Sequence, residues 1–598
     1  MGLVIIMNQS NFFPRTNLSL ILASFLLLVS CSQEAENQQA NQQNNQVPVE
    51  NSNTSNVYAD DIYTNARIYT LDNALPWAEA IAVKDGEILA VGSNNEVMAM
   101  VGPDTNSTDL EGRMMMPGIH DTHAHPVDAG ITELYECSFR TTNLTEALET
   151  IRGCAADAEP GAWITGGQWF ESYFEEGVMP KSVLDDLSIE NPIFFMDWSA
   201  HNAWLNSRAL DLLAITNDTP NPNGGAVVRD LNSGESTGIL LDNAAYNFKR
   251  EVDQYSIAQY KEAIRWSIDQ MVQVGITTYK DAFTIADSLA AYIELDQQGE
   301  LKARVKTSLS WKSAWADSHE SELAVIASRR DHTSEYMDTD FAKIMLDGIP
   351  PTYTAALIEP YMPSEEFGDD YHGYTMLEAD ELIQDVVNLD AQGITVKIHA
   401  TGDASVRMAL NAFAAARERN GDSGLIHEVS HAEMIHPDDL LRFYELNVAP
   451  EMAPNLWYPA ALGDLRPLLG EGRHLFWQIN SLYESGALVI YGSDWPVVPS
   501  PNPWTGIEAM VTRMDPTGQD PTVGWIDEAV DLETAIKIFT INSAIANKDG
   551  DSSGSLIAGK NADFIVLDRN IFEVPIEDVG ETQILLTVVD GGHVYSEL

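Results

Sequence analysis

The stretch VKIHATGD (396–403) ends a short apolar run at His399, and LIHEVSH (425–431) ends the next one at His431. Runs of this kind recur between residues 113 and 548 and end at about His120, Asp281, Leu309, Leu346, His399, His431, Ala453 and Gly492. Segments with helical periodicity separate them: from Ile257 to Val274, apolar residues recur every three or four positions, and a glycine follows as a cap. Eight strands that alternate with helices predict an α/β fold, a (β/α)8 TIM barrel.

Further folding units are predicted around this barrel. Two strand-like runs, AWITGGQW (162–169) and PIFFMDW (192–198), fall between the first and second barrel strands, so we expect an inserted α/β subdomain at about residues 130–255. Short β-rich runs separated by turns fill residues 57–112, and similar runs fill residues 549–598. The two ends of the chain are therefore expected to assemble one small composite β-sandwich.

The amino terminus predicts export. Residues 18–29 are mostly apolar and follow a basic residue; the run is too short to span a bilayer and has the size of a signal-peptide core. LVSC (28–31) resembles the cleavage box of bacterial lipoproteins. Residues 1–30 are thus expected to be a lipoprotein-type signal peptide, Cys31 the lipidated residue, and residues 31–56 a disordered Gln/Asn-rich tether. The chain is expected in a bacterial cell envelope, as a periplasmic or outer-membrane lipoprotein; an ordinary cleaved signal is the alternative.

Composition limits the partners. The 598 residues include 33 basic and 90 acidic ones, a net charge of −57, so phosphate backbones are repelled and no nucleic-acid binding is expected. Membrane contact is expected only through the lipid on Cys31. Three cysteines are too few for a disulfide scaffold; after export, Cys137 and Cys154 would either pair or remain two buried thiols. A homodimer is one assembly that the sequence leaves open.

The histidine pattern indicates a metal site. His123-Ala124-His125 follows the first predicted strand, and residues i and i+2 of an extended segment point the same way, so both imidazoles can reach one cation. His399 and His431 end the fifth and sixth strands, and Asp494, in ALVIYGSD (487–494), ends the eighth. One histidine at a strand end is more often a packed polar residue than a ligand, but the ordered series is hard to reach by accident. Neutral imidazoles and a carboxylate suit zinc or a similar divalent ion.

Beyond these residues, the chain resembles the amidohydrolase superfamily, and more narrowly amidohydrolase family 3, the YtcJ-like branch that includes N-substituted formamide deformylases. The motifs that carry the resemblance are MPGIHDTHAH (116–125), SAHNAWLNSRAL (199–210), ESTGIL (235–240), GITTYKDA (275–282), KIMLDG (343–348), KIHATGD (397–403), HEVSHAE (427–433), YGSDWPV (491–497) and GKNADFIVLD (559–568). The resemblance covers the chain from Ile62 to Tyr595. The resemblance implies the same barrel fold and an enzyme that hydrolyses carbon–nitrogen bonds other than peptide bonds.

The resemblance also implies a second metal. Lys343 matches the lysine of the family's K-x-x-x-D-G motif, which in related enzymes is carbamylated by CO₂ and bridges two metals. Carried over to this sequence, one ion would be held by His123, His125 and Asp494, and the other by His399 and His431. The expected cofactors are two divalent ions of the zinc type and a CO₂-derived carbamate on Lys343. A single-metal site is the alternative if Lys343 stays unmodified.

The expected reaction is hydrolysis of an amide, N-acyl or N-formyl amine by a metal-activated hydroxide, with Asp494 as the general base. The resemblance places His201 beside the substrate, a small molecule with an apolar or aromatic part, and Trp169 and Trp204 are expected to wall its pocket; packing is the alternative for all three. His120 is expected to be packed rather than a ligand. A deaminase or an ester or lactone hydrolase would use the same site. The alternative of another class is a non-catalytic, surface-anchored ligand-binding lipoprotein.

Overall fold

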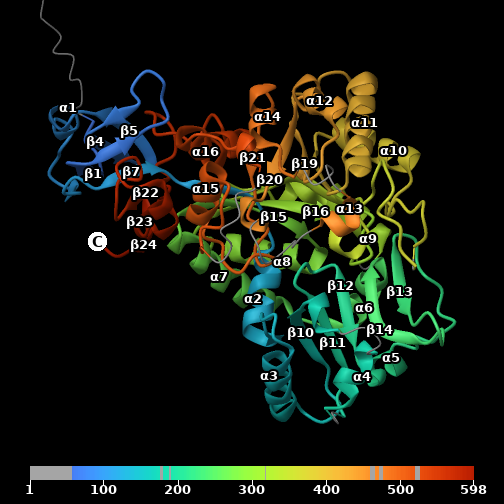
Figure 1. Cartoon of the computed structure of the whole chain (residues 1–598). Helices are drawn as coiled ribbons and strands as arrows, with labels where there is room; N and C mark the ends of the chain where they lie inside the picture. Colours follow the sequence, from blue (N-terminus) through green and yellow to red (C-terminus); the bar gives the residue numbers. More distant parts are fainter. Residues whose placement is uncertain are drawn as a thin grey trace, which may run out of the picture. The chain divides into compact units, whose positions relative to one another are not determined.

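The computed structural model describes residues 57–174, 179–187, 190–316, 318–365, 367–457, 465–470, 476–518 and 525–598. Its centre is a sheet of eight parallel strands whose spatial order follows the chain (Figure 1). These strands are β8 (Ile119–Ala124), β15 (Ile276–Thr284), β16 (Arg304–Ser310), β17 (Met337–Met345), β18 (Thr395–Ala400), β19 (His427–His431), β20 (Val448–Met452) and β21 (Ile490–Tyr491). The predicted TIM-barrel fold is thereby confirmed.

The first and eighth strands meet at the end where the site lies. Ala124 pairs with Trp495 in a parallel bridge, and the backbone amide of His125 donates to the carbonyl of Trp495 over 2.7 Å. The amide of Asp494 donates to the carbonyl of His123 over 2.8 Å. Backbone hydrogen bonds therefore hold the HxH pair next to Asp494, although some 370 residues of chain separate them.

Helix α7 (Ile257–Gln273) shows how the sequence sets the barrel's outer layer. It begins at Ser256, whose side chain accepts from the amide of Gln259 in a capping box. Its buried residues include the predicted apolar positions Tyr260, Ile264, Ile268 and Met271. Gly275 follows with φ = 92°, a left-handed conformation that costs glycine little, and turns the chain into β15.

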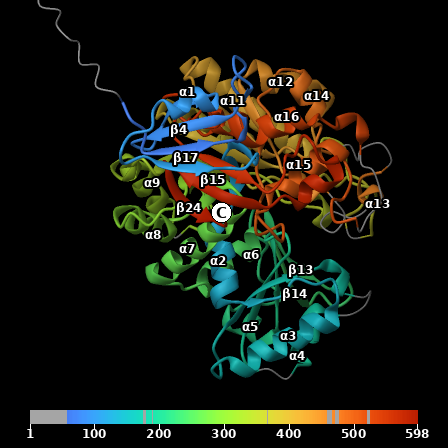
Figure 2. The same ribbon diagram turned by 90° about the vertical axis from the view of Figure 1, so that its left-hand side faces the viewer.

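A second, six-stranded sheet lies within the segment expected as an insertion. Its order is β13 (Gly225–Arg229), β14 (Ser236–Asp242), β12 (Asn202–Leu205), β11 (Ile193–Asp197), β10 (Ile164–Trp169) and β9 (Cys137–Ser138). Helices α3 (Leu144–Asp157), α4 (Pro180–Asp185) and α5 (Ser207–Leu212) accompany it (Figure 2). Strand β14 leads directly into α6 (Asn243–Val252), whose residues Tyr246 and Lys249 line the cavity described below.

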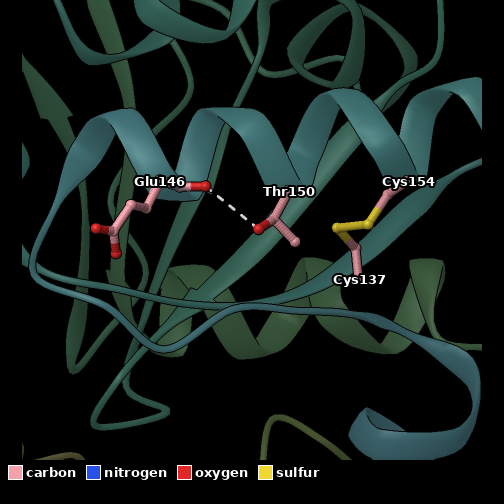
Figure 3. The surroundings of a disulfide bond; sticks show 4 residues. All are labelled: Cys137, Glu146, Thr150 and Cys154. Atoms are coloured by element: carbon pink, nitrogen blue, oxygen red, sulfur yellow. Dashed lines mark hydrogen bonds between the residues drawn. A yellow bond between two sulfur atoms is a disulfide. The ribbon is translucent and has the colours of Figure 1, made fainter.

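The edge of this sheet carries a disulfide. Cys137 of β9 is bonded to Cys154 near the end of α3 (Figure 3). The hydroxyl of Thr150, one turn earlier in α3, donates to the carbonyl of Glu146. Of the two states that the sequence left open for these cysteines, the structure has the bonded one.

Two further sheets are present, and both ends of the described chain contribute strands to the second of them. The first has the order β5 (Glu87–Gly92), β4 (Ala80–Lys84), β1 (Asp61–Thr64) and β6 (Asn106–Asp109); the second has β24 (Gly592–Ser596), β23 (Ile584–Val589), β22 (Phe564–Leu567), β7 (Met114–Pro117), β2 (Arg67–Tyr69) and β3 (Trp77–Ala78). In the second sheet β22 pairs antiparallel with β7, so Phe564 lies opposite Pro117. One apolar core contains residues from both ends, among them Tyr63, Ile81, Phe564 and Val588.

The predicted signal peptide (residues 1–30) and tether (residues 31–56) lie outside the described residues. The prediction of a lipid on Cys31 therefore stays a prediction. In the part of the chain that the structure describes, no helix combines the length and the apolar character needed to cross a membrane.

Candidate metal centre

Six residues expected as metal ligands line one cavity at the carboxyl ends of the barrel strands. They are His123, His125, Lys343, His399, His431 and Asp494. The cavity is also lined by residues of the inserted segment, among them Trp198 and His201. Parallel strands of a barrel deliver their last side chains to the same face, which explains why residues so far apart in the chain meet here.

Asp494 is the point where the imidazoles converge. Its Oδ1 lies 3.4 Å from Nε2 of His123 and 3.4 Å from Nε2 of His125. Its Oδ2 lies 4.0 Å from Nδ1 of His431. The ring centroids of His399 and His431 are 4.5 Å apart. His123, His125 and Asp494 offer ligand atoms that all lie within 4.8 Å of one another, a spacing suited to a single cation.

The backbone is strained where two of these ligands sit. His431 has φ = 68° and Asp494 has φ = 59°, both in the left-handed region that non-glycine residues rarely occupy. Residues are held in this conformation only where the surrounding structure fixes them, and such strain gathers at functional sites. At Asp494, the hydrogen bond from its amide to His123 supplies part of that restraint.

Burial keeps the ligand histidines neutral. It lowers the pKa of His123, His399 and His431 well below the usual range. Repulsion between neighbouring cations disfavours the charged forms further, from Lys343 at His123, from His431 at His399 and from His123 at His431. Burial alone would raise the pKa of Asp494, but His123, His125 and Lys343 together hold it below its ordinary range. Neutral imidazoles facing an ionised carboxylate are the donor set that zinc prefers.

Lys343 lies inside this ligand set. Its side chain is 1% exposed, and its Nζ lies 3.2 Å from Nε2 of His123 and 3.4 Å from Oγ of Ser430. Burial, with the positive charge of Lys397 nearby, lowers the pKa of Lys343 to about 7. A substantial neutral fraction therefore exists at neutral pH, and the neutral amine is the form that can add to CO₂. The position and chemistry of Lys343 fit a bridging carbamate.

A chain of buried charges beneath the cavity was not foreseen from the sequence. Oε1 of Glu451 lies 2.7 Å from Nδ1 of His123, and the other carboxylate oxygen pairs with Lys397. Lys397 also contacts Glu428 over 2.8 Å, and Glu428 pairs with Lys280. All four of these charged side chains are at most 1% exposed.

Glu451 sets the tautomer of His123. Because the Nδ1 hydrogen of His123 is donated to Glu451, its Nε2 presents a lone pair on the side of Asp494. A lone pair and a carboxylate oxygen that face each other are satisfied by a cation between them, which is further evidence that the residues fit a metal ion. Carboxylate–histidine–metal arrangements of this kind raise the basicity of the ligand and orient its ring.

We predict that Glu451→Gln weakens metal binding by about 10–100-fold, the usual effect of removing such a partner of a ligand histidine. The measurement is the metal dissociation constant in competition with a chelator. Glu508→Gln is the matched control. Glu508 is also buried, but it lies on helix α15 (Pro503–Thr512), accepts from the amide of Gly580 and does not line the cavity. Equal metal affinity in wild type and Glu451→Gln would contradict this role.

Two acidic residues around the expected metal ligands were also not predicted from the sequence. Asp347, fully buried, accepts from the amides of Ala356, Thr401 and Gly402 and so braces the loop that follows His399. Glu433, two residues after His431, lines the cavity. Burial, with Asp347 and Asp494 nearby, raises the pKa of Glu433 to about 8. The sequence signal was weak, because a carboxylate just beyond a strand end also suits a solvent-exposed loop.

His201 lines the cavity, as expected from the resemblance, and is held from behind. Its Nδ1 lies 2.7 Å from Oδ1 of Asp242, and the hydroxyl of Tyr374 donates to Oδ2 of the same carboxylate. Burial alone would lower the pKa of His201, but the hydrogen bond and charge of Asp242 raise it. The His201 ring centroid lies 5.1 Å from that of His399, so His201 faces the metal ligands.

The expectation for Trp169 and Trp204 is corrected by the structure. Both are buried in the core of the inserted sheet, where their indole N–H groups donate to the carbonyls of Phe195 and Pro180. Neither lines the cavity. Its large aromatic residues are instead Trp198, Tyr246, Phe283 and Trp315. Strand periodicity could not separate these cases, since both faces of the inserted sheet carry apolar residues.

His120 is packed below the site and makes no contact with the cavity. It is fully buried, with Nε2 2.9 Å from the hydroxyl of Ser553. Burial, with Lys306 and Arg304 nearby, lowers its pKa to about 3. The folded protein therefore keeps His120 neutral at pH values where an unfolded chain, with a pKa near 6.5, takes up a proton.

This difference predicts a pH-dependent stability. Wild type should lose about 1.4 kcal/mol of unfolding free energy for each pH unit below 6.5, relative to His120→Gln, because only the unfolded wild type gains that proton. The loss grows as the pH falls toward 3. Denaturant titrations of the metal-free proteins between pH 7 and pH 5 measure it. Parallel pH profiles for the two proteins would show that His120 is protonated in the folded state.

The sequence of this chain is similar to those of known proteins of one family. The model of the amidohydrolase family matches residues 107–595. The chain belongs to this family. It is 28% identical to an N-substituted formamide deformylase of Arthrobacter pascens over 88% of this chain and 96% of that protein. It is 27% identical to the protein LONG AFTER FAR-RED 3 of Arabidopsis thaliana over 90% of this chain and 92% of that protein.

A solved structure shares the fold of this amidohydrolase. It is an uncharacterized metal-dependent hydrolase from Pyrococcus horikoshii, with a TM-score of 0.67 and 22% identity over 86% of this chain and 99% of that one. Family membership makes the chain a hydrolase of carbon–nitrogen bonds with a metal-dependent site. The non-catalytic alternative is set aside, since the family is shown and all six expected ligand positions line one cavity.

Proposed function

We propose that this amidohydrolase hydrolyses N-acyl or N-formyl amines with two divalent metal ions, of the zinc type, and a carbamate on Lys343. One observation carries the proposal: Asp494 touches the imidazoles of both HxH residues, while Lys343 reaches into the same cluster. His123, His125 and Asp494 would hold one ion, His399 and His431 the other, and the Lys343 carbamate would join them. When bound, the ions acidify water and polarise the substrate carbonyl.

Asp494 moves the proton in this proposal. It is ionised at neutral pH and central in the ligand set, so it can accept a proton from the attacking water and pass it to the leaving nitrogen. His201 stands across the cavity, fixed by Asp242, where it can donate a hydrogen bond to the substrate. The buried hydrogen bond from Tyr374 to Asp242 keeps this pair oriented.

The substrate is proposed to be a small molecule with an aromatic or apolar part. The aromatic residues Trp198, Tyr246, Phe283 and Trp315 line the cavity together with the aliphatic Ile349. Aromatic walls with a few convergent polar groups are typical of small-molecule sites. The likeness to an N-substituted formamide deformylase supports an N-formyl amine as one member of the class.

We also propose that the enzyme is exported and anchored by a lipid on Cys31, with no other membrane contact. The disulfide between Cys137 and Cys154 supports an oxidising compartment. Replacing Cys31 with serine should release the protein from the membrane fraction of expressing cells. Retention of the Cys31→Ser protein in that fraction would contradict the anchor.

The test of the proposed function is turnover by the metal-loaded enzyme. N-formyl and N-acetyl 2-phenylethylamine match the expected bond and the aromatic cavity, and release of the primary amine is measured. 2-Phenylethyl acetate and adenosine test the ester-hydrolase and deaminase alternatives. Hydrolysis of either amide at a higher kcat/KM than the ester supports the proposal. Turnover of the ester or adenosine alone would replace it.

A further inference from the structure

One carboxylate in the cavity has a buried oxygen with no hydrogen-bond partner among the described residues. Glu433 is 4% exposed and lines the cavity together with Asp494 and His431. Its Oε2 makes no hydrogen bond to any residue in the described part of the chain. Buried polar atoms are paired in the great majority of cases, and each exception calls for an explanation such as a missing ligand. The proposed proton transfer does not use Glu433.

The backbone places this carboxylate in the cavity at a cost. His431 and Ala432 are consecutive non-glycine residues with φ of 68° and 40°, so the chain turns sharply just before Glu433. The carbonyl of Glu433 accepts from the amide of Trp477 over 2.9 Å, and the next amide, Met434, donates to the carbonyl of Thr401 over 3.1 Å. The backbone of Glu433 is thus fixed on both sides, and its side chain is 4% exposed.

The surroundings of Glu433 are acidic rather than basic. The carboxylates that act on it are those of Asp347 and Asp494. Neither group of described residues with metal-ligand spacing includes Glu433; one contains His123, His125 and Asp494, and the other His123, His431 and Glu451. A buried carboxylate that faces other carboxylates, outside the ligand groups, is completed by a ligand that brings N–H donors or a positive charge.

We propose that Glu433 binds the amine nitrogen of the substrate, so that the enzyme selects N-acyl derivatives of primary amines. In the amide, Glu433 accepts the hydrogen bond of the N–H group. After cleavage, the positive charge of the released ammonium group favours the ionised form of Glu433, which burial disfavours in the empty cavity, and the two groups pair. The inference rests on the proposed function, because it takes the leaving group of that reaction as the bound group.

The step balances with water as the only co-reactant. The water oxygen forms a bond to the carbonyl carbon, and the carbon–nitrogen bond breaks. One water proton passes through Asp494 to the nitrogen as the carbon–nitrogen bond breaks. The other leaves the new carboxylic acid and protonates the released amine, so an amide R–CO–NH–R′ and water yield R–COO⁻ and R′–NH₃⁺. Glu433 gives up no atom. Glu433 and Asp494 line the same cavity, and the proposal places the ammonium group between them.

The test is a binding measurement that needs no turnover. Isothermal titration of the metal-loaded enzyme uses 2-phenylethylammonium as the charged probe and 2-phenylethanol, which has nearly the same shape, as the neutral one. Glu433→Gln keeps the side-chain size and removes the charge, and Glu508→Gln is the control for a buried glutamate outside the cavity. Metal content is measured for every variant.

The expected result is ammonium binding about 10-fold or more weaker in Glu433→Gln, since hydrogen bonds to charged groups are the stronger ones. The alcohol should bind all variants alike, Glu508→Gln should bind the ammonium like wild type, and Glu433→Asp should recover part of the affinity. Equal ammonium binding by wild type and Glu433→Gln, or no ammonium binding to wild type, would overturn the proposal. A loss of metal from Glu433→Gln would also overturn it by making Glu433 a ligand.

The experiments distinguish a failure of the proposed amine site at Glu433 from a failure of the proposed hydrolysis. If the ammonium binds through Glu433 but neither amide is hydrolysed, the amine site stands and the proposed reaction fails. If both amides are hydrolysed with the same kcat/KM by wild type and Glu433→Gln, the reaction stands and the amine site fails. The ratio of kcat/KM for N-formyl-2-phenylethylamine over its N-methyl derivative adds a kinetic readout, and Glu433→Gln should lower that ratio.

Discussion

Asp494→Asn should reduce kcat by about 10²–10⁴-fold while leaving the fold intact, the range expected when a positioned acid–base group is removed. The amide cannot accept a proton from water, so both proton transfers proposed for Asp494 are lost. The fold should survive because asparagine has nearly the same volume and is among the residues that best tolerate the left-handed conformation of this position, φ = 59°. The measurement is kcat on the amide that wild type hydrolyses best.

The control for this variant is Asp439→Asn. Asp439 is equally buried but pairs with Arg407 and Arg442, away from the cavity. It should keep activity close to wild type. Circular dichroism and metal content are recorded for both variants, because Asp494 is also an expected ligand. Near-wild-type turnover by Asp494→Asn would contradict the proposed proton transfer by Asp494.

Lys343→Ala should bind one metal ion fewer than wild type and lose activity by about 100-fold or more. A metal that polarises the carbonyl is worth several kcal/mol, and about 3 kcal/mol corresponds to about 100-fold in rate. The variant removes the group that would bridge the two ions while leaving His123, His399 and Asp494 unchanged. Metal analysis and kcat/KM on the same preparation measure both effects.

A small carboxylate provides the control for Lys343→Ala. The substitution opens space beside His123 Nε2, where Lys343 Nζ lies in the wild type. Acetate or formate has two oxygens like a carbamate and should restore part of the second metal and of the activity. It should not rescue Asp494→Asn. Wild-type metal content in Lys343→Ala without added acid would show that Lys343 is no bridge.

The barrel could be predicted because the beginnings and ends of most of its strands can be recognised in the sequence. Most of the apolar runs end in a polar or small residue, and segments with helical periodicity separate them, as α7 does before β15. The positions of His399, His431 and Asp494 could be predicted from this pattern, because the carboxyl ends of all strands in a parallel barrel lie at the same face. Lys343 needed the family resemblance, because a lysine inside a strand has no spacing that marks it as a ligand.

The residues that could not be predicted depend on contacts across the barrel. Glu428, Lys397 and Glu451 each sit within an apolar strand, and which charges pair depends on the registers of three neighbouring strands. Trp169 and Trp204 lie on strands whose two faces are both buried, so periodicity did not show which face met the cavity. Glu433 is set by an unusual turn at Ala432, φ = 40°, that no turn residue announces.

The most direct test of the central claim is the metal content of the mature protein, purified without chelator from a chain starting near residue 56, together with its intact mass. Two divalent ions per chain, with a mass increase of about 44 Da that maps to Lys343 under non-acidic conditions, are the predicted result for a bridging carbamate. One ion or none, even after reconstitution with metal and bicarbonate, and an unmodified Lys343, would contradict the two-metal site.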